Sequence, residues 1–522
     1  MITPVSARPT NLINLALQNK QQSPPAQREP YHHTTSPRNT RASIFYVNDY
    51  HGKSINYERT ITASNAFNNL KHTEPTDILK LGSGDFLLGE VESVNKAAIA
   101  AQNKIGISAT AVGNHEYDMP DSIGKFIPDM KYRMLACNVK IKPENPLTKK
   151  IEKSFIEEHN GNKYGIIGIS PTDLMSRLKY GKIFEEIEVS DINKTINEVQ
   201  TEVDKLKSQG VDKIILLSHA GFGYDQKIAQ STDGIDVILG GHSHNLLQSV
   251  KTGENLVYSK SGEPVVITQA GRDGKHFGIL NLEFNNKGVI TQVQNNVTSS
   301  RGFKRNASAR YIFDQILGKP RVIGKINSAP PPLVNDLTDP NGHANFIADS
   351  MKYTMGTDIA LILSANIRGY FEPGDIDTRI IEDISPFKNK ICSIKYTEKE
   401  IIDALKFSAT SQVTQNNKPG ILHTSGLKYE MSKDGRLLSA AFIDKNGKET
   451  PIDINNPRTD KLYAVAISDY HASGHDNYTM LNKIDKADRI TDFDINKCIE
   501  DYIIAQGKPV DIIDDGRVRV QS

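Results

Sequence analysis

Short runs of apolar, often β-branched residues recur along the chain between positions 44 and 269, separated by polar or glycine-containing segments. The runs that we predict to be strands are 44–47, 78–81, 107–112, 134–139, 165–169, 213–217, 236–239 and 265–269. Helix-like stretches lie between several of them, most clearly at 93–103 and 192–209. Strands buried on both faces and joined by helical or loop crossovers are typical of an α/β domain, which we predict for this region.

The pattern changes after position 320. Helix-like segments at 343–355 and 398–410 are mixed with strand-like runs at 359–363, 391–396 and 462–468 without steady alternation, which favours an α+β domain. Residues 298–319 are polar and contain a weakly helical segment at 307–317. We therefore predict a first domain at 42–300, a linker with a helix at 301–322 and a second domain at 323–522.

The first 41 residues are rich in Pro, Gln, Asn, Ser and Thr, and Glu29 is their only acid. This composition predicts a disordered tail at 1–41, with an organellar transit peptide as the alternative because the segment is acid-poor and contains arginine. No run approaches the roughly 18 apolar residues of a membrane helix, so we expect no membrane insertion. With no legible signal peptide the default location is the cytoplasm, and export or an organelle are the alternatives.

Charge and cysteine content exclude some classes of function. The 522 residues include 63 Lys and Arg against 62 Asp and Glu, so the net charge of +1 argues against a protein that binds nucleic acid polymers through a basic surface. Cys137, Cys392 and Cys498 are too few and too scattered for a disulfide framework or a thiolate metal site. A hydrophobic share of 38% is typical of a soluble globular protein but indicates no activity.

Five polar segments directly follow predicted strands. They are Asn48-Asp49-Tyr50-His51-Gly52, Gly84-Asp85, Gly113-Asn114-His115-Glu116-Tyr117-Asp118, Ser218-His219-Ala220 and Gly240-Gly241-His242-Ser243-His244. Loops at the carboxyl ends of strands are where α/β proteins build their sites. Residues two apart in an extended segment point the same way, so we expect Asp49 and His51 to converge on one point, and His242 and His244 likewise.

The residue types in these segments suit metal chemistry. Imidazole, carboxylate and carboxamide groups together favour divalent ions such as Zn²⁺ or Mn²⁺, and Asp85 can bridge two ions through its two oxygens. Two such ions would bring more positive charge than Asp49 and Asp85 neutralise, which favours an anionic substrate. Paired metals about 3.5–4 Å apart are the usual device for in-line displacement at phosphorus. The pattern therefore predicts hydrolysis of a phosphate ester by a metal-activated hydroxide.

In order and spacing, the five segments resemble the D-x-H-G, G-D, G-N-H-E, lone-His and G-H-x-H motifs of the calcineurin-like metallophosphoesterases. The longer segments 47–53 and 111–118 are similar to the 5′-nucleotidase branch, which includes UDP-sugar hydrolases and 2′,3′-cyclic phosphodiesterases. The resemblance continues through the second region. It implies a four-layer α/β sandwich, with two mixed β-sheets flanked by helices, followed by an α+β substrate-specificity domain.

The resemblance also implies a ligand set for two metal ions. Zn or Mn are the expected ions, and Mg, Ca or Fe are the alternatives. One ion would be held by Asp49, His51 and His244, the other by Asn114, His219 and His242, with Asp85 bridging the two. At the second motif the family commonly has D-A-G-D, whereas this chain has Gly82-Ser83-Gly84-Asp85. The missing acid is not a ligand position, so we expect a local change of packing without loss of metal.

A catalytic pair follows from the same resemblance. His115 corresponds to a histidine that is not a ligand but contacts the phosphate and stabilises or protonates the departing oxygen. Asp118 would orient and charge that imidazole, because side chains one helical turn apart can meet.

Three loops of the second region, at 364–369, 385–389 and 470–478, are candidate recognition surfaces. An arginine can clamp a phosphate, and two aromatic rings can hold a nucleobase at about 1–3 kcal/mol for each stacking contact. The resemblance implies that Phe387 and Tyr470 are the two aromatics, that Arg368 is the arginine and that Asp476 lies near the ribose. The asparagine that reads the base is displaced to Asn366 or missing, and a glycine-richer turn is replaced at 474–477.

The leading hypothesis is a two-metal phosphohydrolase that acts on nucleotides or nucleotide-like phosphate esters. A 2′,3′-cyclic nucleotide phosphodiesterase or a UDP-sugar or nucleotide pyrophosphatase on the same site is the alternative within enzymes. From another class, a non-catalytic nucleotide-binding protein is disfavoured because no metal ligand is missing. The expected partner is a small molecule, and the sequence does not indicate an oligomeric state.

Overall fold

The computed structural model describes residues 3–4, 39–70, 74–88, 91–118, 123–177, 185–331, 333, 337–413 and 420–521. Most of the predicted tail at 1–41 therefore lies outside the described residues. The chain forms two compact units, Met1–Lys319 and Pro320–Ser522, which are called the first and the second domain below. None of the helices in the described ranges combines the length and the apolar character of a membrane-spanning helix.

Two sheets form the centre of the first domain. The larger has the order β1-β16-β15-β2-β3-β4-β5-β7, with bounds Thr3–Pro4, Ile290–Ser299, His276–Phe284, Thr40–Val47, Asp77–Gly82, Ala109–Ala111, Arg133–Leu135 and Ile151–Glu152. The smaller has the order β13-β14-β12-β11-β9-β8, with bounds Leu256–Tyr258, Pro264–Thr268, Val237–Leu239, Lys213–Ser218, Asn162–Ile169 and Ser154–His159. Strands β2, β3 and β4 are parallel neighbours in one sheet, and β9, β11, β12 and β14 are parallel neighbours in the other.

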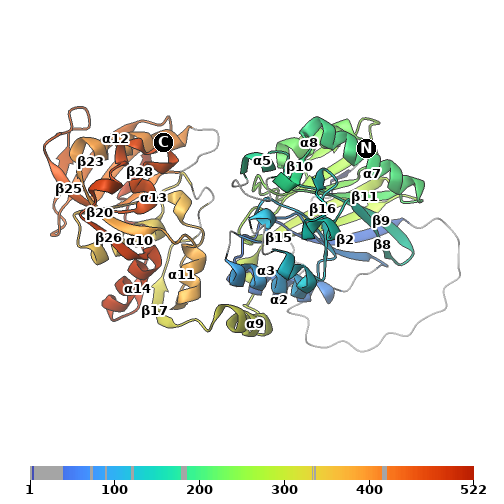
Figure 1. Ribbon diagram of the computed structural model, residues 1–522, viewed down its shortest axis with the longest axis horizontal. Coiled ribbons are helices and arrows are strands. Elements are labelled where there is room, and N and C mark those ends of the chain that lie inside the picture. Colours follow the sequence, from blue (N-terminus) through green and yellow to red (C-terminus); the bar gives the residue numbers. More distant parts are fainter. Residues whose placement is uncertain are drawn as a thin grey trace. The chain divides into compact units, whose positions relative to one another are not determined.

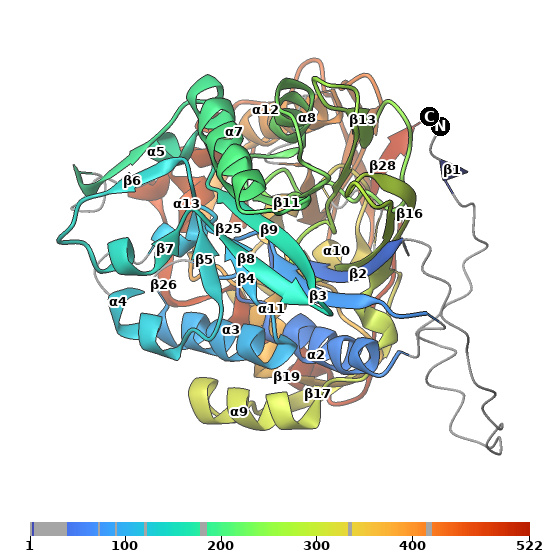
Figure 2. The same cartoon turned by 90° about the vertical axis from the view of Figure 1, so that its right-hand side faces the viewer.

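The first domain has four layers, as predicted. Aliphatic side chains of both sheets, such as Ile44 and Leu81 against Leu217 and Val237, share one buried core between the sheets. The outer face of the larger sheet is covered by α2 (Ser54–Asn68), α3 (Glu92–Ile105) and α9 (Ala307–Leu317). The outer face of the smaller sheet is covered by α7 (Ile192–Ser208) and α8 (Phe222–Ser231). Figure 1 and Figure 2 show these two groups of helices on opposite sides of the strands.

The second domain is an α+β unit, also as predicted. Its main sheet has the order β21-β18-β25-β20-β26, with bounds Leu422–Ser425, Ile359–Leu363, Leu462–Ser468, Lys390–Thr397 and Arg489–Asp494. Helices α10 (Gly342–Met355) and α14 (Ile495–Gln506) pack on one face, and α12 (Glu398–Ala409) packs on the other. A second sheet has the order β24-β23-β22-β28, with bounds Glu449–Ile452, Leu437–Ile443, Leu427–Ser432 and Val518–Gln521.

The predicted strands recur with small shifts of their bounds, and one prediction is wrong. The run 134–139 is not one strand, because it contributes to β5 and to β6 (Val139–Ile141), which lie in different sheets. Between them the amides of Ala136 and Cys137 donate to Glu152 and Gly168, at 2.8 and 2.7 Å, and this turns the chain away from β5. The helix expected in the linker is present as α9, which belongs to the first domain and buries Ala309 and Phe313 in its core.

Candidate active site

The five polar segments meet at one place in the first domain. Three of them follow β2, β3 and β4 of the larger sheet, and two follow β11 and β12 of the smaller sheet. Three groups of side chains there bring their ligand atoms within 4.8 Å of one another. The groups are Asp49, His51 and His244; His51, Asp85 and His115; and Asp85, His219 and His242.

The backbone that aims these side chains differs from the prediction. Asp49 and His51 are not extended but left-handed, with φ of 53° and 49°, and His242 and His244 have φ of 72° and 59°. Asp49 and His51 converge as expected, but not because the segment is extended, whereas His242 and His244 fall in two different groups of ligand atoms and do not converge on one point. The amide of His51 donates to the carbonyl of Asp85 at 2.9 Å, and the amide of His242 donates to the carboxylate of Asp49 at 3.1 Å. Hydrogen bonds between the loops thus hold a conformation that a single strand would not adopt.

Glycine is required where the loops approach most closely. A Cβ atom on Gly84 would lie 2.7 Å from the backbone nitrogen of Gly113 and from the Nδ1 atom of His219. A Cβ atom on Gly113 would lie 2.2 Å from the carboxylate of Asp85. These two glycines allow the loops after β3 and β4 to close around the candidate ligands.

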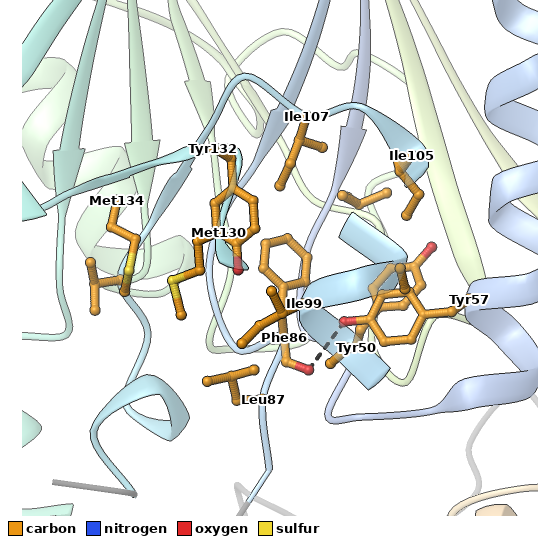
Figure 3. Packing of buried hydrophobic residues seen from close by; sticks show 14 of the residues in the cluster. Tyr50, Tyr57, Phe86, Leu87, Ile99, Ile105, Ile107, Met130, Tyr132 and Met134 are labelled. Carbon is orange, nitrogen blue, oxygen red and sulfur yellow. Dashed lines mark hydrogen bonds between the residues drawn. The ribbon is translucent and has the colours of Figure 1, made fainter. Parts of the chain in front are cut away.

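Apolar neighbours of the candidate ligands anchor their loops in the core. Tyr50 lies between two candidate ligands in sequence and Phe86 follows Asp85, yet both aromatic side chains are fully buried. Figure 3 shows them packed beside Tyr57 of α2, whose hydroxyl donates to the carbonyl of Phe86 at 3.1 Å. The rings of Tyr50 and Tyr57 are 4.5 Å apart. Burial of each such ring stabilises the fold by about 1.5–3 kcal/mol, so the polar loops are anchored on a rigid apolar base.

Glu116 is a structural member of the site that the sequence interpretation did not assign a role. Its buried carboxylate accepts hydrogen bonds from the backbone amides of Asp85, Phe86, Leu87 and Gly113, at 2.7–3.2 Å. Burial and the nearby charge of Asp85 raise the pKa of Glu116. One carboxylate thus joins the loops after β3 and β4, and its place in the G-N-H-E segment was the available signal.

Asp85 lies between the two sets of candidate ligands. Its Oδ2 atom is 3.6 Å from Nε2 of His51 and 3.1 Å from Nε2 of His219. On one side, Oδ1 of Asp49 is 3.4 Å from Nε2 of His244 and 4.0 Å from Nε2 of His51. These distances agree with the order of the predicted ligand set, in which Asp85 connects both halves.

The second half of the cluster contains His219, His242 and Asn114. The rings of His219 and His242 are 5.1 Å apart, and Nδ1 of His242 is 3.1 Å from the side-chain oxygen of Asn114. The Nε2 atom of His219 is buried and faces Oδ2 of Asp85 at 3.1 Å. A buried imidazole nitrogen of this kind, facing carboxylate and carboxamide oxygens, fits a site for a divalent metal ion.

Three of the imidazoles have an oxygen partner on the nitrogen that faces away from the cluster. Nδ1 of His51 lies 3.0 Å from the carboxylate of Asp273, and Nδ1 of His219 lies 2.5 Å from the carbonyl of Ser83. Nε2 of His242 lies 3.5 Å from the carboxylate of Asp173. Such outer partners orient histidine ligands in metal sites. Asp173 and Asp273 were not predicted, because no spacing in the sequence connects them to the histidines.

For Asp85, Asp49 and His219, burial and the contacts with oppositely charged neighbours shift the pKa in opposite directions. Burial opposes ionisation of Asp85, but His219 and His51 hold its pKa well below the ordinary value. The pKa of Asp49 is lowered in the same way, against its burial, by His219 and His244. Burial lowers the pKa of His219, but Asp85 and Asp49 outweigh it and raise the value to about 10. The carboxylates are therefore ionised, which is the form in which they would bind a metal ion.

His115 and Asp118 are in direct contact. The short helix η1 (His115–Tyr117) places Nδ1 of His115 2.6 Å from the Asp118 carboxylate. Nε2 of His115 lies 4.0 Å from Asp85, toward the cluster. Burial lowers the pKa of His115, but the Asp118 hydrogen bond and the charge of Asp85 raise it above the ordinary value. The pair can therefore hold a proton beside the cluster.

The three candidate recognition loops of the second domain meet at one end of its main sheet. Strands β18 and β25 are parallel and β20 is antiparallel to both, so residues that follow β18 and β25 lie beside those that precede β20. The amide of Arg368 donates to the carbonyl of Ile384 at 2.7 Å, which joins two of the loops. The guanidinium of Arg368 lies 5.4 Å from the ring centre of Phe387.

Some buried polar atoms in these loops lack a hydrogen-bond partner among the described residues. Within the described ranges, the buried side-chain oxygens of Asn366 and Ser385 have no hydrogen-bond partner. In the third loop, Tyr470 stacks on His475 with ring centres 4.3 Å apart. The carboxylate of Asp476 lies 3.2 Å from Nε2 of His471 and accepts a hydrogen bond from the hydroxyl of Tyr470 at 3.5 Å. All five predicted substrate residues thus lie on these loops of the second domain.

Comparison with known proteins identifies both domains. Residues 42–246 match the family profile "Calcineurin-like phosphoesterase", and residues 322–483 match "5′-nucleotidase, C-terminal domain". The chain is 24% identical to a probable 5′-nucleotidase of Treponema pallidum (strain Nichols), over 85% of this chain and 88% of that protein. It is 32% identical to the 5′-nucleotidase of Mus musculus over 46% of this chain and 44% of that protein.

Solved structures share the fold over nearly the whole chain. A 5′-nucleotidase precursor from Thermus thermophilus superposes with a TM-score of 0.66 at 23% identity, over 92% of this chain and 99% of that one. The sulfate thiohydrolase SoxB of the same species superposes with a TM-score of 0.64 at 14% identity, over 95% and 98%. At these identities the likeness concerns the fold alone.

The two domain matches lie one within each of the two compact units. The first domain is the catalytic domain of a metal-dependent phosphoester hydrolase, and its Asp and His cluster is suited to divalent metal ions. The chain belongs to the 5′-nucleotidase family of the calcineurin-like metallophosphoesterases.

Proposed function

We propose that this protein uses two divalent metal ions to release phosphate from nucleotides or nucleotide-like phosphate esters. The observation that carries the proposal is the convergence of seven candidate ligands with the pair His115 and Asp118 at the ends of five strands. Those residues come from five segments spread over nearly two hundred positions, between Asp49 and His244. A purely structural cluster would not need so many buried, charged groups, because each costs desolvation.

The donor atoms fit the expected ligand set. One ion would be held by Asp49, His51 and His244, the other by Asn114, His219 and His242, with Asp85 shared between them. A set of imidazole, carboxylate and carboxamide donors favours Zn²⁺ or Mn²⁺. When bound, such ions supply Lewis-acid chemistry, because they polarise the phosphate and lower the pKa of a water toward ~7.

The protein's own contribution is to position the substrate and hold a proton. The pKa of the His115 imidazole is raised, and its Nδ1 atom contacts the carboxylate of Asp118. The ring therefore holds a proton, and its Nε2 atom would donate a hydrogen bond to the phosphate and to the departing oxygen. Asp118 would maintain the orientation and charge of that imidazole during the reaction. Glu116 and the glycines of the loops would keep the backbone preorganised.

Recognition of the organic part of the substrate is assigned to the second domain. Arg368 would contact phosphate, Phe387 and Tyr470 would stack on a base, and Asp476 would accept from a ribose hydroxyl. The buried side-chain oxygen of Asn366 has no hydrogen-bond partner among the residues that the structure describes, and this supports a polar ligand there, since such atoms normally find a partner. The names of relatives, which include a trifunctional nucleotide phosphoesterase of Bacillus subtilis, are consistent with a nucleotide substrate.

A substrate panel tests the proposal. The full chain, supplied with Mn²⁺ or Zn²⁺, would be assayed for phosphate release from nucleoside monophosphates, 2′,3′-cyclic nucleotides, UDP-sugars and a generic aryl phosphate. Faster turnover of a nucleotide than of the aryl phosphate is the expected result. Faster turnover of the cyclic diester or the UDP-sugar would assign the same site to the phosphodiesterase or pyrophosphatase alternative. No turnover of any compound would contradict the proposal.

A further inference from the structure

Asp273 is a fully buried carboxylate beside the metal cluster that none of the five motifs contains. It lies on the loop between β14 and β15, and its backbone is left-handed, with φ of 59°. Its Oδ1 atom is 3.0 Å from Nδ1 of His51. An ionised carboxylate has no proton to give, so the hydrogen in this contact belongs to the imidazole.

The backbone of Asp273 is fixed from two directions. Its amide donates to the carbonyl of Asp49 at 2.6 Å, and its carbonyl accepts from the side chain of Asn56 on α2 at 2.7 Å. The next residue, Gly274, is also left-handed, and a Cβ atom there would lie 2.6 Å from the ring of Tyr50. The loop is therefore held against the segment that carries Asp49 and His51, without freedom to shift.

The charge of Asp273 is balanced inside the protein. Its Oδ2 atom lies 3.5 Å from Nε of Arg272 and 3.9 Å from Nζ of Lys275. A buried carboxylate is tolerated when it is paired in this way. The chain thus maintains an ionised group behind His51, on the side of the ring opposite the cluster.

We propose that Asp273 is a positioning residue for the metal centre. By accepting the Nδ1 hydrogen of His51 it selects the tautomer with a free lone pair on Nε2, the atom that faces Asp49 and Asp85 at 4.0 and 3.6 Å. It also prevents rotation of the ring and increases the electron density of the ligand. This inference rests on the proposed function only in taking His51 as a metal ligand.

The outer partners of His219 and His242 place less negative charge close to the ring than Asp273 does. His219 has a neutral carbonyl, that of Ser83, and His242 has Asp173, whose side chain is 42% exposed and 3.5 Å away. Of these three outer partners within the described residues, Asp273 alone is a fully buried carboxylate, 3.0 Å from the ring of His51. The effect of removing a charge should therefore be largest at Asp273.

The test measures metal binding directly. Asp273→Asn keeps the shape of the side chain and removes its charge. Metal-depleted full-length protein would be titrated with Mn²⁺ alone by calorimetry, and we expect affinity to fall by about 10–100-fold. Nitrogen NMR of the His51 ring in the metal-depleted protein, at a pH high enough to leave the ring neutral, would report a change from the Nδ1-protonated tautomer toward a mixture.

A matched control separates positioning from general destabilisation. Asp77 is also a buried carboxylate, and it accepts hydrogen bonds from Asn162 at 2.8 Å and Tyr164 at 2.7 Å at the start of β3, the end remote from the cluster. Asp77→Asn should lower the unfolding temperature without changing Mn²⁺ affinity. Equal weakening by both variants, or an affinity within threefold of wild type in Asp273→Asn, would overturn the inference.

A double variant tests the route of the effect. In a His51→Ala background, Asp273→Asn should reduce Mn²⁺ affinity no further, because the residue acts through that ring. A further reduction equal to that in the wild-type background would refute the route. These readouts do not depend on the substrate, so metal binding without nucleotide turnover would contradict the proposed function and leave this inference standing.

Discussion

The imidazole of His115 and the carboxylate of Asp118 are joined by a 2.6 Å contact across the short helix η1. The contact is on Nδ1, so Nε2 remains directed toward Asp85 and the cluster, 4.0 Å away. His115 lies next to a candidate ligand, Asn114, in sequence, yet its own ring is backed by a partner outside the metal set. In the proposed mechanism this arrangement would separate proton transfer, by His115 and Asp118, from metal binding.

We expect His115→Ala to reduce kcat by about 10²–10⁴-fold, the usual contribution of a general acid. Metal content, measured by elemental analysis of the purified variant, should stay at the wild-type value. Asp118→Asn should retain more activity, because the imidazole is still present but less well oriented. A loss of metal in His115→Ala would instead make His115 a ligand.

Glu116→Gln should destabilise the first domain and weaken metal binding together. The amide can accept from only one pair of the four backbone amides, and its NH₂ group would face the other pair. Two buried donors without partners cost about 2–4 kcal/mol in the free energy of unfolding. Urea unfolding would measure this loss, and Glu157→Gln, on a partly exposed carboxylate of β8, would serve as the control. Wild-type stability in Glu116→Gln would show that these hydrogen bonds are dispensable.

The fold and the candidate ligands could be predicted because both depend on local patterns. Strands buried on two faces appear as apolar runs, and β18 and β25 have the predicted bounds. Ligands that directly follow such strands are brought together by the parallel order of the sheet. The same argument does not depend on the detailed backbone of each loop, so it succeeds even where the backbone was predicted wrongly.

What could not be predicted depends on partners far apart in sequence. Helix α2 was missed because its buried residues mix apolar side chains, such as Ile61 and Phe67, with polar ones. Glu58 pairs with Arg305 at 2.5 Å, and the hydroxyls of Thr60 and Tyr50 are 2.6 Å apart. This mixture blurs the apolar stripe from which a helical periodicity is detected. The contact between Asp273 and His51 spans 222 positions and has no motif. Such pairs become visible only when the sheets bring their loops together.

The stacking of His475 on Tyr470 predicts a change of specificity. A base that stacks on Tyr470 competes with the imidazole for the ring, whose centre is 4.3 Å away. His475→Ala should therefore lower KM for nucleoside monophosphates by about 5-fold or more, since one stacking contact is worth about 1–3 kcal/mol. The aryl phosphate should be hydrolysed with unchanged kcat/KM, which provides the internal control. A higher KM would instead make the imidazole part of the platform that binds the base.

Acid should destabilise the second domain through His423. This fully buried histidine lies 3.2 Å from the hydroxyl of Ser364 and 3.3 Å from the side-chain oxygen of Asn345, and burial together with the charge of Arg517 lowers its pKa to about 3. The unfolded chain takes up a proton near pH 6.5 whereas the folded domain does not, so stability is full above that pH and falls as the pH decreases toward 3. The expected loss is about 1.4 kcal/mol per pH unit in this window. Hydrogen exchange of β21 at pH 7 and pH 5 would measure it, with β11 of the first domain as the reference. His423→Gln should flatten the dependence, and an unchanged slope in that variant would assign the acid sensitivity to other groups.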